Sequence, residues 1–243
     1  MLVIVDKTDN NYSFLPINRD TMSEVRLIQD DGTGAATAEL QLCTAHWYGG
    51  NAGQSCANTV ESISKLFGGL KIDGYYAIPM DEIPKLNHSV GGVTVTLLED
   101  FQDIDRQMKK GETLALSDEQ AYRYIHDRYG VGDEKNTSRM KRQQQYMEAF
   151  FTKAKEKAKS DKAYVGQLFR EFEQTATTNL TAKKISGLTN RLIKGTQKGF
   201  FEIKGTSKIG KALGDGIDHA EFYPDKESII DVMTKIYGLK KRE

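Results

Sequence analysis

Short stretches in which apolar and polar residues alternate predict β-strands along the chain. The clearest is residues 93–97, where valine and leucine alternate with threonine, as expected for a strand with one buried face. Residues 1–5 and 12–17 predict two more strands, and the Asp-Asn-Asn cluster at 9–11 between them predicts a hairpin turn. Further strands are predicted at residues 72–78, 200–203 and 220–222.

Stretches with apolar residues every three or four positions predict helices between these strands. Their approximate ranges are 58–67, 79–86, 117–128, 137–175, 180–192 and 225–236. Asn58 and Ser117 are predicted to cap the starts of two helices, because glutamate and glutamine follow them three residues later. The polar segment 22–40 instead contains Asp30-Asp31-Gly32-Thr33-Gly34 and predicts a loop. Strands alternating with helices predict an α/β fold in a single domain over residues 1–243, with a mixed β-sheet sandwiched by α-helices.

The helix predicted to start at residue 137 or 138 carries the most distinctive polar face. Arg139, Arg142 and Gln143 are spaced i, i+3 and i+4 and share one side of it. Arg128 lies at the end of the preceding helix. Guanidinium groups donate paired, charge-assisted hydrogen bonds to phosphate oxygens and stay charged at any relevant pH. The face therefore suits a phosphate ligand, although a solvated charged helix would show the same pattern.

Five motifs in a fixed order give the chain a resemblance to a known family. Gly91–Val95 is followed by Lys110–Glu112, by Leu116–Ala121 and by Arg139–Gln143, while Pro16–Thr21 precedes them all. The set resembles the LytR-CpsA-Psr family, with Asn18 departing from its Pro-Arg-Asp-Thr motif. The resemblance covers roughly residues 1–155.

The resemblance implies a phosphotransferase. Such a protein moves an anionic cell-wall glycopolymer, such as teichoic acid, from a polyprenyl pyrophosphate carrier to a peptidoglycan hydroxyl. It implies an extracellular domain at the outer face of the cytoplasmic membrane of a Gram-positive-type bacterium. It also implies that a membrane anchor and a first strand are missing before Met1, with an aspartate of that strand. No apolar run of the sequence approaches the length that spans a bilayer.

The resemblance also implies the site residues. Arg19 and Asp20 are the catalytic candidates, with Asp20 binding magnesium or activating the acceptor hydroxyl; Asp20 as a turn or cap residue is the alternative. The pyrophosphate, at one end of an elongated apolar cavity, would contact Arg19, His126, Arg128, Arg139, Arg142 and Gln143.

Two departures bear on activity, and they keep a second function open. His126 replaces an arginine of the family's Arg-x-Arg pair, and Asn136 stands where an aspartate is usual. A module that holds polyprenyl-phosphate lipids without turnover is therefore the alternative. A transcriptional regulator is a third reading, but no helix-turn-helix pattern is visible. Lysine plus arginine number 34 and aspartate plus glutamate number 34, so the basic surface that nucleic-acid binding needs is not indicated.

The two cysteines, Cys43 and Cys56, can be two buried thiols or one disulfide. A zinc site would need four suitably spaced ligands, and a second cysteine pair is not present. The extracellular setting implied by the resemblance favours the disulfide, because such bonds persist in oxidising compartments.

Overall fold

A computed structural model describes residues 1–29 and 31–238 of the chain, which divides into two compact units. The first unit comprises Met1–Ala77, Thr177–Ile185 and Thr196–Glu243, and the second comprises Ile78–Ala176 and Ser186–Gly195. Strands and helices occur in both, so the predicted α/β class is confirmed.

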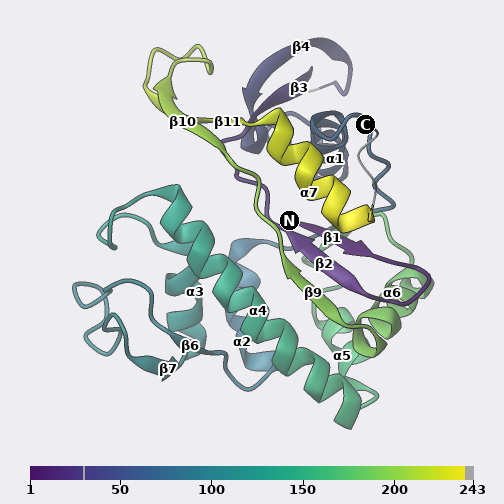
Figure 1. Ribbon diagram of the computed structural model, residues 1–243, viewed down its shortest axis with the longest axis vertical. Coiled ribbons are helices and arrows are strands. Elements are labelled where there is room, and N and C mark those ends of the chain that lie inside the picture. The colour runs from purple at the N-terminus through teal and green to yellow at the C-terminus, as the bar shows by residue number, and fades with distance from the viewer. Residues whose placement is uncertain (30, 239–243) are drawn as a thin grey trace. The chain divides into compact units, whose positions relative to one another are not determined.

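The first unit contains a three-stranded mixed sheet in the order β1-β2-β9 (Figure 1). Strands β1 (Leu2–Val5) and β2 (Tyr12–Leu15) pair antiparallel, as the predicted hairpin requires. Strand β9 (Gln197–Phe200) joins β2 in parallel. The ring of Phe14, which is fully buried, stacks on that of Phe200 with 4.8 Å between centroids.

Two helices, α1 (Ala52–Leu66) and α7 (Lys226–Tyr237), bury their apolar sides on this sheet. Leu2, Ile4 and Leu15 of the strands share one apolar cluster with them. From the helices the cluster takes Ile63, Leu66, Ile229, Val232, Met233 and Ile236.

Helix α1 starts earlier than the sequence predicts. Asn51 caps it by accepting a hydrogen bond from Gln54 N at 3.0 Å, and the predicted cap Asn58 lies buried inside the helix. The Asn58 amide donates to the carbonyls of Arg26, Ala45 and Tyr48 instead. The start predicted at Asn58 is therefore wrong, because this asparagine ties the helix to neighbouring segments.

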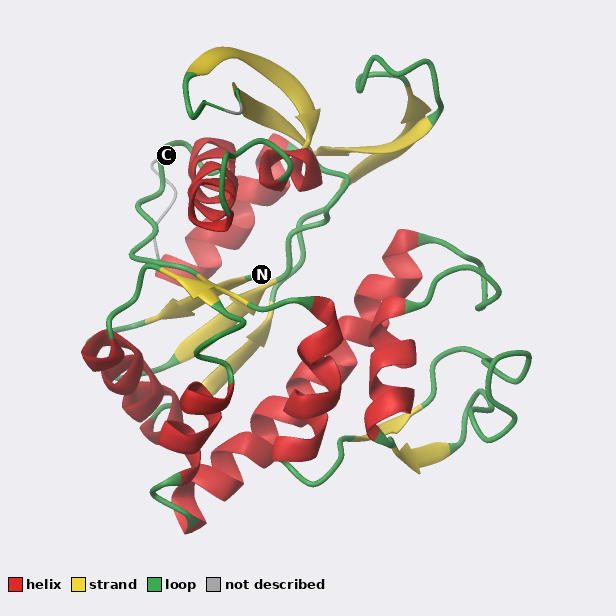
Figure 2. Cartoon of the chain, turned by 180° about the vertical axis from the view of Figure 1, so that it is seen from behind, coloured by secondary structure: helices red, strands yellow, loops and turns green. Residues whose placement is uncertain are grey.

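Two β-hairpins complete the first unit (Figure 2). One pairs β3 (Met22–Ile28) with β4 (Gly34–Gln41), and the other pairs β10 (Gly205–Gly210) with β11 (His219–Pro224). The loop predicted over 22–40 is wrong except at its turn, where Asp30 lies outside the described residues. The strand predicted at 72–78 shortens to β5 (Tyr76–Ala77), which pairs with β8 (Thr177–Thr178).

The second unit is largely helical. Two 3-10 helices occur among the described residues. One, η1 (Leu42–His46), lies in the first unit, and the other, η2 (Met80–Glu82), lies in the second. The second unit further contains α2 (Ile83–Ser89), α3 (Asp118–His126), α4 (Asn136–Ser160), α5 (Tyr164–Glu171), and the paired strands β6 (Thr94–Thr96) and β7 (Thr113–Ala115). Helix α6 (Ala182–Lys194) begins in the first unit's residues and ends in the second's.

The predicted capping box at the start of α3 is confirmed. Ser117 Oγ accepts from Gln120 N at 3.2 Å, and Gln120 Oε1 accepts from Ser117 N at 3.1 Å. Two backbone donors that the helix itself cannot satisfy thus find partners. Among the described residues, no helix has the length and apolar character needed to cross a membrane.

Asn87 is the polar centre of the second unit's core and is 1% exposed. Its Nδ2 donates to Leu116 O at 3.0 Å and Asp118 Oδ1 at 2.8 Å, and its Oδ1 accepts from Val93 N at 2.9 Å. One side chain of α2 thus fixes the strand at 93–97 and the entry to α3.

We expect Asn87→Ala to lower the free energy of unfolding by about 2–4 kcal/mol, since each buried group left without a partner costs about 1–3 kcal/mol. The measurement is urea denaturation beside Asn190→Ala, which removes the same atoms from an exposed position of α6. Equal stabilities of the two variants would contradict the role given to Asn87.

Candidate functional site

Most of the predicted phosphate contacts belong to the second unit, and they lie where α3 ends and α4 begins. His126 is the last residue of α3, Arg128 follows it in the connecting loop, and Arg139, Arg142 and Gln143 lie in the first turns of α4. The structure therefore brings five of the six predicted pyrophosphate contacts to one junction.

Side chains of α4 satisfy the carbonyl groups at the end of α3. Gln143 Nε2 donates to Ile125 O at 2.9 Å, and Arg142 Nη2 donates to Asp127 O at 2.6 Å. Arg142 Nη1 donates to a third carbonyl, that of Tyr124. The last carbonyls of a helix have no partner within it, and cations there also offset the negative end of the helix dipole. The predicted polar face of α4 is real, and much of it is directed at α3.

Arg142 corrects the prediction that this guanidinium contacts a ligand. Its side chain is 1% exposed, and its Nε lies 2.7 Å from Glu99 Oε2 as an ion pair. The guanidinium carbon lies 5.0 Å from the centre of the Phe101 ring. Burial lowers the pKa of Arg142, and the Glu99 carboxylate opposes that shift. A guanidinium enclosed in this way has a structural role and does not present itself to a pyrophosphate.

His126 and Arg128 lie closer to solvent. The exposed His126 ring stacks on Tyr122 with 4.7 Å between centroids, and its Nδ1 lies 3.0 Å from Asp127 Oδ1. The Arg128 guanidinium lies 4.5 Å from the centre of the Tyr129 ring and donates to the Tyr129 hydroxyl. Tyr129 is 73% exposed, so the pair stands at the surface, where an anion could displace the tyrosine contact.

Arg139 and Gln143 are both partly buried. Arg139 Nη2 donates to Asn136 Oδ1 at 2.7 Å, and its Nη1 approaches His126 O at 3.5 Å. The asparagine that replaces the family's usual aspartate is thus a direct partner of the first arginine.

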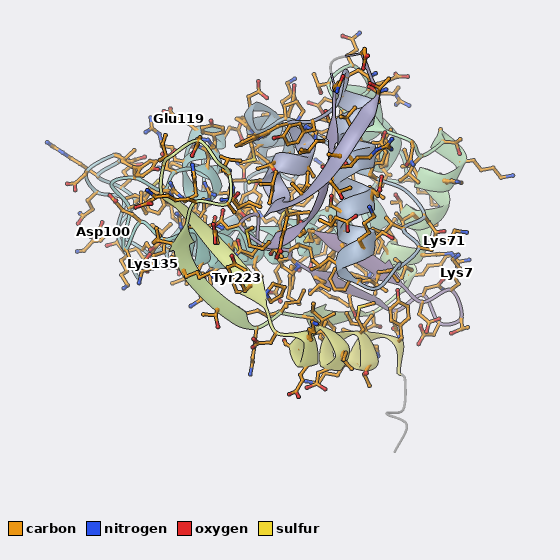
Figure 3. All side chains as sticks on the ribbon, turned by 90° about the horizontal axis from the view of Figure 1, so that it is seen from above. Lys7, Lys71, Asp100, Glu119, Lys135 and Tyr223 are labelled. Carbon is orange, nitrogen blue, oxygen red and sulfur yellow. The ribbon has the colours of Figure 1, made fainter. Side chains whose placement is uncertain are left out.

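Arg19 and Asp20 lie in the first unit, between β2 and β3, in a segment fixed by its backbone. Asn18 Oδ1 accepts from Asp20 N at 2.9 Å. The carbonyls of Arg19 and Asp20 accept from Cys43 N at 2.9 Å and Phe222 N at 2.8 Å. Phe222 belongs to the hairpin on which Figure 3 labels Tyr223. The Arg19 and Asp20 side chains are 52% and 16% exposed, with 3.6 Å between Nε and Oδ1.

The predicted magnesium ligand set is not assembled by these residues alone. Across residues 1–29 and 31–238, no group of three or more histidine, cysteine, aspartate or glutamate side chains is placed to hold a metal ion. Asp20 supplies one carboxylate, and Arg19 already lies beside it. Magnesium prefers six oxygen ligands and commonly takes several from substrate phosphates and water. The described side chains therefore do not fit a magnesium site without such a substrate.

Two residues of the site were not singled out from the sequence. Glu99 lies two residues after the clearest predicted strand, 93–97, and a carboxylate close to the end of a buried strand was the available signal. Asn18 was taken only as a departure from the family motif, whereas its side chain holds the turn that presents Asp20. An asparagine side chain that accepts a hydrogen bond from the backbone N–H two residues later is a common turn arrangement.

The first unit also contains a cavity of about 520 Å³ at the start of α7, with polar and charged lining. Its lining residues are Glu202, Lys204, Asp225, Lys226, Glu227, Ser228, Asp231, Val232 and Lys235. None of the predicted site residues lines it. The elongated apolar cavity beside the arginines stays a prediction.

The resemblance favours a disulfide between Cys43 and Cys56, whereas in the structure both cysteines are free thiols. Cys43 is partly exposed in η1, and Cys56 is buried in α1. Burial raises the pKa of the Cys56 thiol, which disfavours the thiolate that forms disulfides.

In folded protein at pH 8, we expect iodoacetamide to label Cys43 before Cys56, because Cys56 is buried and its thiol ionises less. Intact-mass spectrometry of the labelled protein follows both reactions. In unfolded, unreduced protein both thiols should react. A mass without any added group would show that the two cysteines are bonded.

We expect Arg142→Met to lower the free energy of unfolding by about 3–5 kcal/mol, because it leaves the Glu99 charge buried without its partner. Arg128→Met removes the same charge from a site nearer to solvent and serves as the control in the same denaturation series. Similar losses in the two variants would contradict the structural role of Arg142.

The comparison with family models matches residues 1–235 to the LytR_cpsA_psr family. Several solved structures have the same fold. Lin1025 from Listeria innocua has 22% identity, a TM-score of 0.65, and coverage of 98% of this chain and 91% of that chain. TagV of B. subtilis has 20% identity, a TM-score of 0.68, and coverage of 98% and 86%.

A third structure, TagT bound to LIIa-WTA, has 19% identity, a TM-score of 0.67, and coverage of 97% of this chain and 82% of that chain. No curated protein sequence matches. The family match spans nearly the whole chain and includes the resembling motifs. The chain therefore belongs to the LytR-CpsA-Psr family.

Proposed function

We propose that this chain is a phosphotransferase that moves an anionic cell-wall glycopolymer from a polyprenyl pyrophosphate carrier to a peptidoglycan hydroxyl. Family membership and the fold shared with TagT, TagU and TagV support a transferase role in cell-wall biogenesis. The complexes of TagT with LIIa-WTA and LI-WTA support a glycopolymer as the transferred group. The proposal places the reaction at the outer face of the cytoplasmic membrane, with the carrier lipid and peptidoglycan as partners.

The observation that carries the proposal is the arrangement of cationic groups after α3. Arg128 stands at the surface on an aromatic ring, next to the exposed His126. Arg139 approaches the His126 carbonyl from α4 and is paired with a neutral asparagine. Guanidinium groups gathered at one helix junction suit pyrophosphate oxygens. Arg142 is not among the proposed contacts, and Gln143 can contribute the second N–H of its amide, since one N–H of Nε2 donates to Ile125 O.

The proposed reaction needs charge neutralisation and one proton acceptor. The acceptor oxygen attacks the phosphorus that bears the glycan, and the bond from that phosphorus to the bridging oxygen breaks. Polyprenyl phosphate leaves, with its developing charge stabilised by Arg128 and Arg139. The hydroxyl proton passes to a carboxylate, for which Asp20 is the proposed base. Magnesium binding stays a proposal that depends on substrate oxygens.

A lipid-binding module without turnover is the second candidate. It is favoured by His126 in place of an arginine, by Asn136 in place of an aspartate, and by the single carboxylate of Asp20. Binding of the lipid is common to both candidates, so only product formation separates them.

The decisive experiment incubates the chain with a polyprenyl pyrophosphate-linked glycan and peptidoglycan fragments, with and without magnesium. We expect glycan-linked peptidoglycan by mass spectrometry. Binding of the lipid without product would support the module instead. If the chain neither binds the lipid nor forms the product, the proposal is overturned.

We expect Arg139→Ala to weaken binding of the pyrophosphate lipid by about 1.5–3 kcal/mol, the range for hydrogen bonds to charged groups. Calorimetric titration measures the affinity. Arg170→Ala, which removes an exposed arginine of α5, is the control and should leave the affinity unchanged. Equal affinities of wild type and Arg139→Ala would remove Arg139 from the site.

A further inference from the structure

The loop that carries Arg128 is held from the inside of the second unit by Glu99. The carboxylate Oε2 lies 2.7 Å from Arg142 Nε, and Oε1 fills the space beside Gly132. A Cβ atom added at Gly132 would lie 1.9 Å from Glu99 Oε1. The carboxylate therefore occupies a position that only glycine leaves open, between the buried guanidinium and the loop.

The other side of Arg142 fixes where α3 ends. Its two terminal nitrogens donate to the carbonyls of Tyr124 and Asp127. Asp127 has left the helical conformation, with ψ 138°. Arg142 thus binds the last turn of the helix and the first residue beyond it, so the direction in which the chain continues to Arg128 is set by this guanidinium.

The loop itself folds over the same ion pair. Val131 is 1% exposed and its N–H donates to Arg128 O at 3.3 Å. Gly130 N donates to Glu134 Oε1 at 2.8 Å. Asp100, directly after Glu99, and Lys135, at the end of the loop, lie on the same side of the unit in Figure 3. Arg128 is therefore displayed by a short, internally bonded loop that rests on Glu99 and Arg142.

We propose that Glu99 is a positioning residue for pyrophosphate binding: through Arg142 and Gly132 it holds the loop 127–132 so that Arg128 and His126 face the ligand. This inference rests on the proposed function. Glu99 does not itself contact the ligand, since a carboxylate would repel it. Its charge offsets that of a guanidinium that cannot otherwise be buried.

The test compares Glu99→Gln with Glu82→Gln. Glu82 is also buried, at 6% exposure, and is also paired with a cation, Lys85, at 2.7 Å. It lies in η2, and its carboxylate accepts from Lys85 Nζ of the adjoining helix α2 at 2.9 Å. A loss of buried charge is thus common to both variants, whereas only Glu99 holds the loop.

Amide hydrogen exchange reports local opening. In Glu99→Gln we expect exchange at Asp127, Gly130 and Val131 to rise at least about tenfold, and the affinity for farnesyl pyrophosphate to fall about tenfold, which corresponds to about 1.4 kcal/mol. In Glu82→Gln the exchange rates of these amides and the affinity for farnesyl pyrophosphate should stay within about twofold of wild type, since that variant leaves the loop contacts intact. Gly132→Ala displaces the carboxylate without changing any charge and also strains the backbone at φ 54°, so it should raise exchange in the same loop, while Glu99→Gln decides whether the carboxylate is the cause.

Unchanged exchange in Glu99→Gln and Gly132→Ala, or equal changes in Glu82→Gln, would overturn the positioning role. Failure of the wild-type chain to bind farnesyl pyrophosphate would overturn the proposed function, while the exchange data would still decide whether Glu99 holds the loop. Restoration of affinity in Glu99→Asp relative to Glu99→Gln would support the need for a negative charge at this position.

Discussion

The second unit depends on one buried guanidinium. Taking the Arg142 charge out of water is costly, and the cost is offset only where an opposite charge and further hydrogen-bond acceptors are all in place. Glu99 supplies the charge, and the open end of α3 supplies the acceptors. The end of one helix, the start of the next and the residue after a β-strand are therefore coupled, because none of these groups is satisfied without the others. A charge at this depth gives the junction a single geometry, which a purely apolar contact would leave less defined.

Features determined by neighbours in sequence were predictable. The capping box at Ser117, the hairpin before residue 12 and the strand over 93–97 each depend on a few adjacent residues. The strands β3 and β4 were not predictable in the same way, because much of the hairpin is exposed and polar and its apolar contacts come from η1 and Leu213. Asn58 shows the same limit: its spacing to Glu61 predicts a helix cap, whereas distant carbonyls decide what its side chain does.

The candidate site shows the same difference between features set by neighbours in sequence and features set by long-range contacts. Helical periodicity places Arg139, Arg142 and Gln143 on one face, and it does so correctly. It does not say what that face meets, and the carbonyls at the end of α3 compete with any phosphate for the same donors. Of the two arginines in the Arg139–Gln143 motif, Arg142 is consequently the less accessible. Arg128 and His126, which lie outside regular structure or at its edge, keep their polar groups nearer to water.

The segment bearing Asp20 has a different consequence, which concerns the order of synthesis. Asp20 bonds through its carbonyl to Phe222, and β2 pairs with β9, so residues near the start of the chain are completed by residues near its end. A ribosome releases the chain from its N-terminus, whereas the second unit is almost entirely contiguous and can fold as soon as it emerges. In the first unit β1 can pair with β2 and β3 with β4 early, whereas β2 gains its second neighbour, β9, only after the second unit has been made. The carboxylate proposed to take the acceptor's proton is thus set in place only after β11 has been synthesised, and a chain cut short before β11 would lack it in its final position.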